Sequence, residues 1–271
     1  MSDKRHERVA ALSITLHGTQ VGILVNYANS KNILVFSPEY QKLHPALKPT
    51  VSLAQIDAPQ FLANPQMTSI RLPPVLSNLL PEGALRKWMA QGVKVSEENE
   101  FPLLAYVGDN LPGAIRAIPL AANEVPPWAL INREQAEPIL MDLGAKSRQF
   151  SLAGVQIKFS SAYKDGRYNI DSGIEGDNWI IKTPSTIHPY VPENEYTVMR
   201  LAESIGVDIP EIKLVELADL NGLPDIALPN ESYAYAIKRF DRTEQGRVHT
   251  EDFAQMFNLY ASDKYDKANY E

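Results

Sequence analysis

The sequence predicts an α+β protein made of two successive units: a small antiparallel β/α unit, then a five-stranded antiparallel sheet with one helix, followed by the start of a helical region. Short apolar runs bounded by Gly, Pro, Asn and Asp predict the strands of both units. Residues 193–205 carry apolar side chains at helical spacing, which predicts the helix of the second unit. Hydrophobic residues make up 44% of the 271, enough to form a packed core.

The first unit begins as a meander of short strands separated by turn residues. We expect three strands, a proline-punctuated connector, two helices and a closing strand, in this order: Ala10–His17, Val21–Asn26, Ile33–Phe36, Pro38–Pro74, Val75–Gln91, Glu97–Tyr106 and Gly113–Leu120. Pro81-Glu82-Gly83 interrupts the first of the two helices, because proline and glycine are poorly tolerated inside a helix. Nothing in the strands is chemically unusual, so a scaffold role is the simplest interpretation.

The second unit follows a boundary of linker composition. Residues 121–127 are rich in Ala and Pro, and Ile131–Leu143 is predicted to be a bridging helix that ends at Gly144. We then expect a strand that leads into the Ser151-to-Gly154 turn, followed by strands and helices in this order: Val155–Ala162, Trp179–Thr183, the helix Glu193–Ile205, Ile212–Leu217, Tyr233–Phe240 and the helix Glu251–Tyr260. The chain is thus predicted to divide into residues 1–122, 123–148, 149–242 and 243–271.

Composition narrows the class of function. The net charge of −7 and the isoelectric point near 5.4 argue against a chain that holds DNA or RNA by itself. No Cys occurs, so disulfides and thiolate metal sites are excluded, which fits a cytoplasmic location. The apolar runs are too short to cross a membrane, and no apolar signal region follows the first residues. The five His show no ligand spacing for zinc.

One loop has the features of a phosphate cradle. Ser151-Leu152-Ala153-Gly154-Val155 can direct successive backbone N–H groups at an anion, because Gly154 has no Cβ to prevent a close approach. Lys182 lies on a predicted buried strand, where an ammonium group needs an anion. The alternative is an ordinary hairpin turn and a lysine that extends to solvent. Neither the P-loop pattern nor the three-glycine dinucleotide pattern is present.

Five segments together resemble one protein family. They are Ser151 to Lys158 (Ser-Leu-Ala-Gly-Val-Gln-Ile-Lys), Trp179 to Pro184 (Trp-Ile-Ile-Lys-Thr-Pro), Asn78 to Gly83 (Asn-Leu-Leu-Pro-Glu-Gly), Val107-Gly108-Asp109 with Gly113-Ala114-Ile115, and Ile237 to Arg242 (Ile-Lys-Arg-Phe-Asp-Arg). Taken in their order along the chain, over roughly residues 10–265, they resemble the HipA family of bacterial serine/threonine kinase toxins. The resemblance implies a first unit of the HipA N-terminal type and a second unit shaped like the N-lobe of a protein kinase.

The resemblance also implies an ATP site. The loop Ser151, Leu152, Ala153, Gly154 and Val155 would bind phosphate, Lys182 would contact the α- and β-phosphates, and Lys238, Arg239 and Phe240 would hold adenine by main chain and stacking. Ser151 matches the family's autophosphorylated serine, which makes it a candidate regulatory site. In kinase-like folds a helix after the lysine strand supplies a glutamate partner, and Glu195 is the candidate.

Three of these assignments have structural alternatives. Ser151 could simply cap its turn. Glu195 could instead complement the positive end of its helix. Phe240 could be a core aromatic, with Asp241 and Arg242 a surface pair that adds little stability.

Phosphoryl transfer also needs groups that this sequence does not show. In the family, the catalytic Asp and the Mg²⁺ ligands lie after the hinge, on an Asp-x-x-x-x-Asn loop and a following Asp. The only such match here, Asp225 to Asn230, precedes the hinge and is interpreted as chance. We therefore expect no catalytic residue and no metal ligand within these 271 residues, and no kinase activity from them alone.

The resemblance implies a toxin that transfers phosphate from ATP to a translation-related protein, such as an aminoacyl-tRNA synthetase, and so arrests growth and produces persistence. It further implies a helix-turn-helix antitoxin as partner, with DNA reached only through that antitoxin. The alternative is a non-catalytic module that binds nucleotide or antitoxin.

Overall fold

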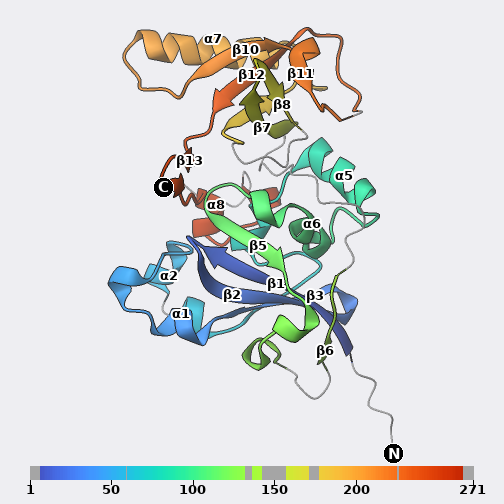
Figure 1. Cartoon of the computed structure of the whole chain (residues 1–271), viewed down its shortest axis with the longest axis vertical. Helices are drawn as coiled ribbons and strands as arrows, with labels where there is room; N and C mark the ends of the chain where they lie inside the picture. The colour runs from blue at the N-terminus through green and yellow to red at the C-terminus, as the bar shows by residue number, and fades with distance from the viewer. Residues whose placement is uncertain are drawn as a thin grey trace, which may run out of the picture.

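The computed structural model describes residues 7–58, 60–131, 136–141, 157–170, 177–224 and 226–264. The chain is mixed α and β, with a sheet of the first unit below, a second sheet above it, and helices α5, α6 and α8 between the two (Figure 1). No helix in these ranges is long and apolar enough to cross a membrane.

The first sheet has the order β4-β3-β2-β1-β5, with β6 added beside β1. Its strands are β1 (Glu7–Leu16), β2 (Thr19–Tyr27), β3 (Lys31–Phe36), β4 (Gln66–Ser69), β5 (Ile115–Pro119) and β6 (Ala136–Pro138). The three predicted strands of the meander are present. Strand β1 is apolar on both faces because Leu12 and Ile14 pack into the main core while Val9 and Ala11 pack into a second cluster on the other face.

The helices of the first unit are short. They are α1 (Pro38–Lys42), α2 (Ala54–Asp57), α3 (Gln60–Ala63), α4 (Pro74–Ser77), α5 (Gly83–Gly92) and α6 (Glu100–Val107). The predicted helix over 75–91 is divided into α4 and α5. Gly83, the first residue of α5, has a φ of 59°, a left-handed conformation that glycine adopts easily. This change of backbone direction, together with Pro81, separates α4 from α5.

The predicted bridging helix Ile131–Leu143 is wrong where the structure describes it. Residues 136–138 form β6, which pairs in parallel with Glu7, Arg8 and Val9 of β1. Pro138 explains this, since proline lacks the N–H of a helix and restricts the residue before it to extended backbone. An edge strand accepts proline because one side of it needs no ladder hydrogen bond.

The second sheet has the order β10-β12-β9-β7-β8-β11. Its strands are β7 (Lys158–Lys164), β8 (Arg167–Asn169), β9 (Trp179–Lys182), β10 (Ile212–Glu216), β11 (Leu220–Asn221) and β12 (Tyr233–Lys238), and helix α7 (Val191–Ser204) lies against β10 and β12. The prediction of five antiparallel strands missed β11, which pairs in parallel with β8. Strand β11 has only two residues, too few to show the alternation of apolar and polar side chains by which a strand is predicted from sequence.

Beyond this sheet the chain returns toward the first unit. A small hairpin, β13 (Arg242–Thr243) with β14 (Gly246–Arg247), precedes helix α8 (Phe253–Met256). Helix α8 is shorter than the predicted Glu251–Tyr260. Asn258 takes a left-handed φ of 55°, a conformation in which a helix ends.

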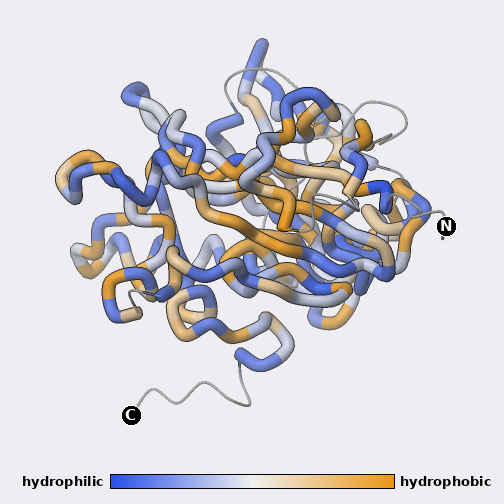
Figure 2. Tube along the Cα trace, turned by 90° about the horizontal axis from the view of Figure 1, so that it is seen from below, coloured by the Kyte–Doolittle hydropathy of each residue, from blue (hydrophilic) through white to orange (hydrophobic). Residues whose placement is uncertain are grey.

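One hydrophobic core extends through both units. Phe159, Ile181 and Ala236, on neighbouring strands of the second sheet, belong to the same buried cluster as Leu12 and Phe101 of the first unit. Figure 2 shows hydrophobic segments along the strands in the middle of the molecule, while hydrophobic and hydrophilic residues alternate along the peripheral loops. The two units therefore stabilise each other by burial of shared apolar surface.

A buried group of charges also joins the two units, and we call Arg239, Asp241 and Arg242 the Arg–Asp–Arg clamp. Arg239 donates from Nε and Nη2 to the two Asp241 oxygens at 2.8 and 2.7 Å, and from Nη1 to Ser160 Oγ at 2.8 Å. Asp241 accepts the backbone N–H of Gly113 at 2.8 Å, and Arg242 donates to the Gly113 carbonyl at 3.0 Å. The clamp thus ties the end of β12 to the turn that precedes β5.

The clamp overturns two alternatives drawn from the sequence. Asp241 and Arg242 are not a surface pair, because their side chains are only 9% and 10% exposed. Phe240 is not a core aromatic, because it is 69% exposed while both of its neighbours point inward. Burial opposes ionisation of Asp241, but hydrogen bonds and charge from Arg239 and Arg242 hold its pKa below the usual value.

We predict that Asp241→Ala lowers the free energy of unfolding by about 3–5 kcal/mol, because the fully buried Arg239 then loses its partner. Arg200→Ala is the control. Arg200 and Glu203 form an ion pair on the exposed face of α7, and its loss should cost less than about 1 kcal/mol. Urea unfolding of both variants measures the difference, and equal small losses would contradict a structural role for the clamp.

Candidate functional site

Three side chains form a row across one face of the second sheet. Tyr235 of β12 lies opposite Lys182 of β9, and Lys182 lies opposite Lys158 of β7. Directly opposed residues of antiparallel strands point to the same face of a sheet. The sheet therefore brings two lysines, 24 positions apart in the sequence, side by side.

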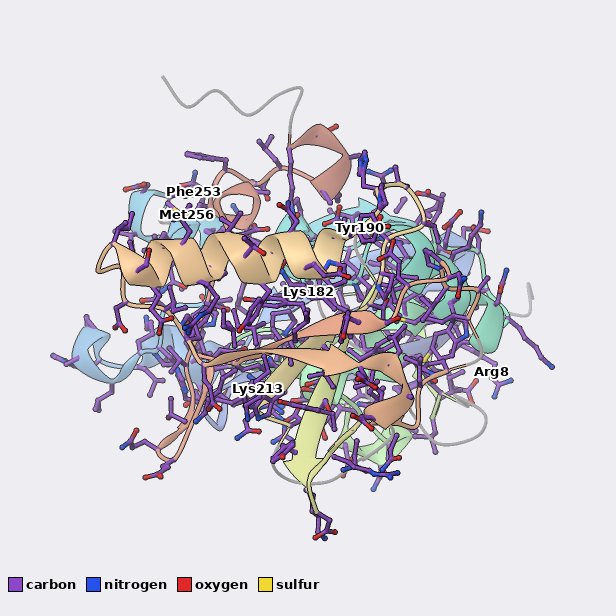
Figure 3. All side chains as sticks on the ribbon, turned by 90° about the horizontal axis from the view of Figure 1, so that it is seen from above. Arg8, Lys182, Tyr190, Lys213, Phe253 and Met256 are labelled. Carbon is purple, nitrogen blue, oxygen red and sulfur yellow. The ribbon has the colours of Figure 1, made fainter. Side chains whose placement is uncertain are left out.

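Helix α7 covers this face and contributes a carboxylate. Lys182 Nζ lies 2.5 Å from Glu195 Oε2, and the two side chains are 25% and 28% exposed. Figure 3 shows Lys182 between α7 and the strands. This is the contact predicted from the sequence. Glu193, not Glu195, is the acidic residue in the first turn of α7, so the alternative role of Glu195 at the helix dipole is weakened, since that effect decays within one turn.

Lys158 is the functional candidate that sequence reasoning missed. Burial and, second, the positive charge of Lys182 together lower its pKa to about 8, although Glu82 and Glu195 act in the opposite direction. Lys158 forms no salt bridge with any residue in the described ranges. A partly buried lysine that lies beside a second lysine and has no carboxylate partner among the described residues favours an anion. The only sequence feature that could have indicated a functional role for Lys158 is its position at the end of the Ser151–Lys158 segment.

The first unit reaches this site through the segment Asn78–Gly83. Asn78 Nδ2 donates to the Leu259 carbonyl at 2.7 Å, and Glu82 lies 3.4 Å from Lys264 Nζ, which also pairs with Asp252 at 3.0 Å. Glu82 is close enough to Lys158 to raise that lysine's pKa. This segment therefore does more than cap and pack a helix: it fixes the chain after β14 and supplies a carboxylate near the lysine row.

The predicted hinge is only partly available to a ligand. The N–H of Lys238 donates to the Glu211 carbonyl at 2.8 Å and that of Arg239 to the Asn178 carbonyl at 2.7 Å. The backbone N–H of Arg239 is thus occupied and its side chain lies in the clamp, so the predicted contact of Arg239 with adenine is left to its main-chain carbonyl. Within the described chain the N–H of Phe240 has no acceptor, and its ring is exposed.

The predicted phosphate loop consists of residues 151–155. Ser151, Leu152, Ala153, Gly154 and Val155 lie outside the described residues, and so does the predicted phosphorylation at Ser151. Strand β7 begins at Lys158, three residues after Val155 in the sequence.

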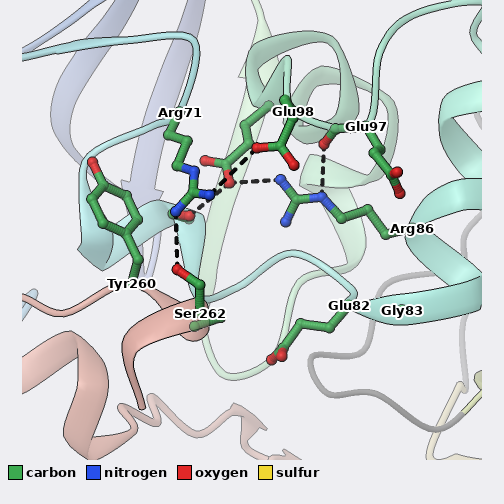
Figure 4. Close-up of a pocket in the computed structure, with 11 residues that line it drawn as sticks. Arg71, Glu82, Gly83, Arg86, Glu97, Glu98, Tyr260 and Ser262 are labelled. Carbon is green, nitrogen blue, oxygen red and sulfur yellow. Dashed lines mark hydrogen bonds and ion pairs between the residues drawn. The ribbon is translucent and has the colours of Figure 1, made fainter. Parts of the chain in front are cut away.

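Two cavities lie elsewhere. One, of about 220 Å³, is lined by Arg71, Arg86 and Ser262 among others (Figure 4), and there Arg86 pairs at 2.6 Å with the buried Glu100. The other, of about 650 Å³, lies along β10 beside Lys213. Neither is lined by Lys158 or Lys182. In the ranges that the structure describes, no three His, Asp or Glu side chains are grouped to hold a metal ion.

Comparison with known protein families gives two matches. Residues 12–118 match the HipA N-terminal domain, and residues 150–271 match the HipA-like C-terminal domain. The first match contains the Asn78–Gly83 segment, and the second contains the lysine row, α7 and the clamp.

Comparison with individual proteins agrees with the two family matches. The chain is 39% identical over 267 residues to "Putative kinase Y4dM" of Sinorhizobium fredii, covering 97% of this chain and 63% of that protein. It is 26% identical over 216 residues to the serine/threonine-protein kinase toxin HipA of Shewanella oneidensis, covering 74% of this chain and 46% of that protein. The chain thus spans about half to two thirds of the length of these relatives.

A solved structure shares the fold. It is the Shewanella oneidensis toxin–antitoxin complex of HipA, HipB and operator DNA, which aligns with 94% of this chain and 57% of the matched chain at a TM-score of 0.58 and 24% identity.

We predict that Lys158 loses its proton near pH 8, whereas ordinary lysines do so near 10.4. NMR titration of the side-chain carbons of labelled lysines measures each pKa, and the Lys158→Arg variant assigns the resonance. If that variant removes a resonance that titrates near 10.4, the environment inferred for Lys158 is wrong.

Proposed function

Because this chain belongs to the HipA family, we propose that it provides the ATP-binding part of a serine/threonine protein kinase toxin. The observation that carries the proposal is the Lys182–Glu195 ion pair between β9 and α7. A strand lysine fixed by a helix glutamate is the arrangement by which protein kinases direct an ammonium group at nucleotide phosphates.

The described residues fit a nucleotide triphosphate. Lys182 and Lys158 offer two adjacent positive charges, of which Lys158 has no carboxylate partner among the residues placed by the structure. Charge-assisted hydrogen bonds from such groups to phosphate oxygens are among the stronger polar contacts in proteins. The exposed ring of Phe240 and its N–H, which has no acceptor among the described residues, would contact adenine, and the backbone of Ser151–Val155 would add donors to the phosphates.

Transfer of phosphate from the bound ATP to a protein is a further part of the proposal. Transfer requires a carboxylate to orient the attacking hydroxyl and Mg²⁺ to neutralise charge on the phosphates. We assign neither role to a residue of this sequence. Phosphorylation of Ser151 would place a strong negative charge in the phosphate loop and compete with the nucleotide.

Membership of the HipA family also supports a proposal about the partners of this chain. A helix-turn-helix antitoxin is proposed as the protein partner, supported by the HipA–HipB–operator complex that shares the fold. The net charge of −7 fits contact with DNA through that antitoxin only. A translation-related protein such as an aminoacyl-tRNA synthetase is the proposed substrate, in the cytoplasm.

We predict that Lys182→Ala weakens ATP binding by about 1.5–3 kcal/mol, roughly tenfold or more in Kd, because one charge-assisted contact is lost. Lys213→Ala is the matched control. Lys213 is a strand lysine of the same sheet, but its ammonium lies over the rings of Tyr163 and Trp179 instead of beside Glu195. Calorimetry of both variants tests the site, and equal affinity for wild type and Lys182→Ala would remove this lysine from it.

We further expect these 271 residues alone, with ATP and Mg²⁺, to transfer no phosphate above background to protein. A radiolabelled transfer assay measures this, and labelled product would refute it. The DNA beyond codon 271 separates the two functional alternatives. An in-frame Asp-x-x-x-x-Asn supports the kinase, whereas a stop codon supports the non-catalytic module.

A further inference from the structure

Strand β10 is an outermost strand of the second sheet, and one of its two edges is open. In the described chain it pairs with β12 only. Just outside the two ends of β10, the N–H of Lys238 donates to the Glu211 carbonyl, and the N–H of Leu217 donates to the Ser232 carbonyl. Hydrogen-bonded pairs alternate along an antiparallel ladder, so these two bonds show which residues of β10 face β12.

The backbone groups of every second residue of β10 point away from the sheet. Both bonds use odd-numbered residues of this strand's extension, so the odd-numbered Lys213 and Val215 also face β12. The even-numbered Ile212, Leu214 and Glu216 direct their N–H and C=O groups to the open edge. Among the residues that the structure describes, none hydrogen-bonds to these three backbone positions. Such an edge is a template for a further strand.

A cavity of about 650 Å³ follows this open edge, and the whole of β10 lines it. On the face of the sheet that carries α7, Tyr196 and Tyr233 bound the cavity, and on the opposite face Tyr163 and Tyr168 do so. No member of the lysine row lines it. The volume is typical of a binding site, and this one is separate from the candidate nucleotide site.

The hydroxyl of Tyr168 indicates that the cavity takes a polar ligand. Tyr168 is 4% exposed and lines the cavity, yet its hydroxyl has no hydrogen-bond partner within the described ranges. A buried tyrosine hydroxyl usually has a partner. A carbonyl group of a peptide in the cavity would accept this unused donor.

Lys213 leaves the edge unprotected. Lysine on an edge strand commonly prevents the addition of another strand. Here the ammonium lies 5.1 Å from the ring centroids of both Tyr163 and Trp179, and 3.1 Å from Glu211 Oε1. Its charge is therefore held over the face of the sheet by two rings and a carboxylate, and does not extend across the open edge.

Negative charge remains at the end of the cavity where β10 ends. Glu216 and Asp219 line it there, and neither forms a salt bridge with a described residue, whereas the ammonium of Lys213 already has Glu211. The net charge of the whole chain is −7. A basic side chain at this end of a bound segment would therefore be attracted.

We propose that the open edge of β10 binds an extended segment of a partner protein as an added antiparallel strand. The segment would carry apolar side chains at alternate positions, which pack beside the half-buried Ile212 and Leu214. It would carry a basic residue near its amino-terminal end, which antiparallel pairing places beside Glu216. This surface does not depend on ATP binding, so a chain that binds no ATP would refute the proposed function and leave this proposal standing.

Amide hydrogen exchange measured by NMR tests the open edge. In the free chain, the amides of Ile212, Leu214 and Glu216 should exchange several-fold faster than those of Lys213 and Val215. The probe is a synthetic peptide of alternating valine and threonine, as long as β10, with lysine at its amino-terminal end. It should protect the three edge amides and leave the other two unchanged. No protection at the highest soluble peptide concentration would overturn the proposal.

The same peptide with N-methyl groups on the amides that face β10 is the control for backbone pairing. It keeps every side chain but cannot donate to the edge, so it should bind at least about tenfold more weakly. Equal binding of the two peptides would contradict strand addition. This control needs no change in the protein and therefore no assumption about the folding of a variant.

Two variants test the edge and its charge by calorimetry. Leu214→Pro removes an N–H of the open edge but none of the ladder with β12, and should weaken the peptide about tenfold. Glu216→Lys should weaken the lysine peptide several-fold and strengthen a twin that carries glutamate instead. Glu203→Lys, on the exposed face of α7, is the matched control and should change neither affinity. Unchanged affinities in both test variants would overturn the proposal.

Sedimentation of the chain alone separates a partner segment from a second copy of this chain. We expect a monomer whose edge amides exchange freely. If the chain instead forms a dimer that protects Ile212, Leu214 and Glu216, the occupant of the edge is a second copy, and the proposal of a partner segment is wrong.

Discussion

The Arg–Asp–Arg clamp is the interaction on which the arrangement of the two units depends. Arg239 is fully buried, and such a charge is tolerated only because Asp241 receives it with two parallel hydrogen bonds. Asp241 in turn accepts the Gly113 N–H of the first unit. Gly113 has a φ of 70°, and a Cβ there would lie 2.7 Å from the Thr250 side chain, so this close approach requires glycine.

The clamp also fixes the strands that carry the candidate site. Arg239 donates to Ser160, which lies two residues from Lys158 on β7, and Ser160 donates to Asp177, two residues before β9. Because these residues bracket the lysine row, the charges at the candidate site are positioned by a network that need not touch a ligand. Phe240 is presented to solvent for the same reason, since both of its neighbours are held inward.

Sequence periodicity was reliable where local pattern and tertiary environment agree. The meander strands and α7 follow from alternating or helical spacing of apolar residues, and turns with Gly or Asn separate them. It failed for residues 136–138, where Pro138 and an open edge of β1 select a strand. It also failed for β11, because two residues gain their strand geometry from β8 alone.

The sequence by itself indicated the family, the strand lysine Lys182 and a candidate partner, Glu195, because the order and spacing of short motifs can be read along the chain, whereas the contact between the two side chains is seen in the structure. Only the tertiary structure placed Lys158 and Tyr235 beside Lys182, since strand register is set by pairing between distant segments. It also placed the Arg239 side chain in the clamp. Whether a charged side chain meets a buried partner or solvent depends on burial, which residue type does not reveal.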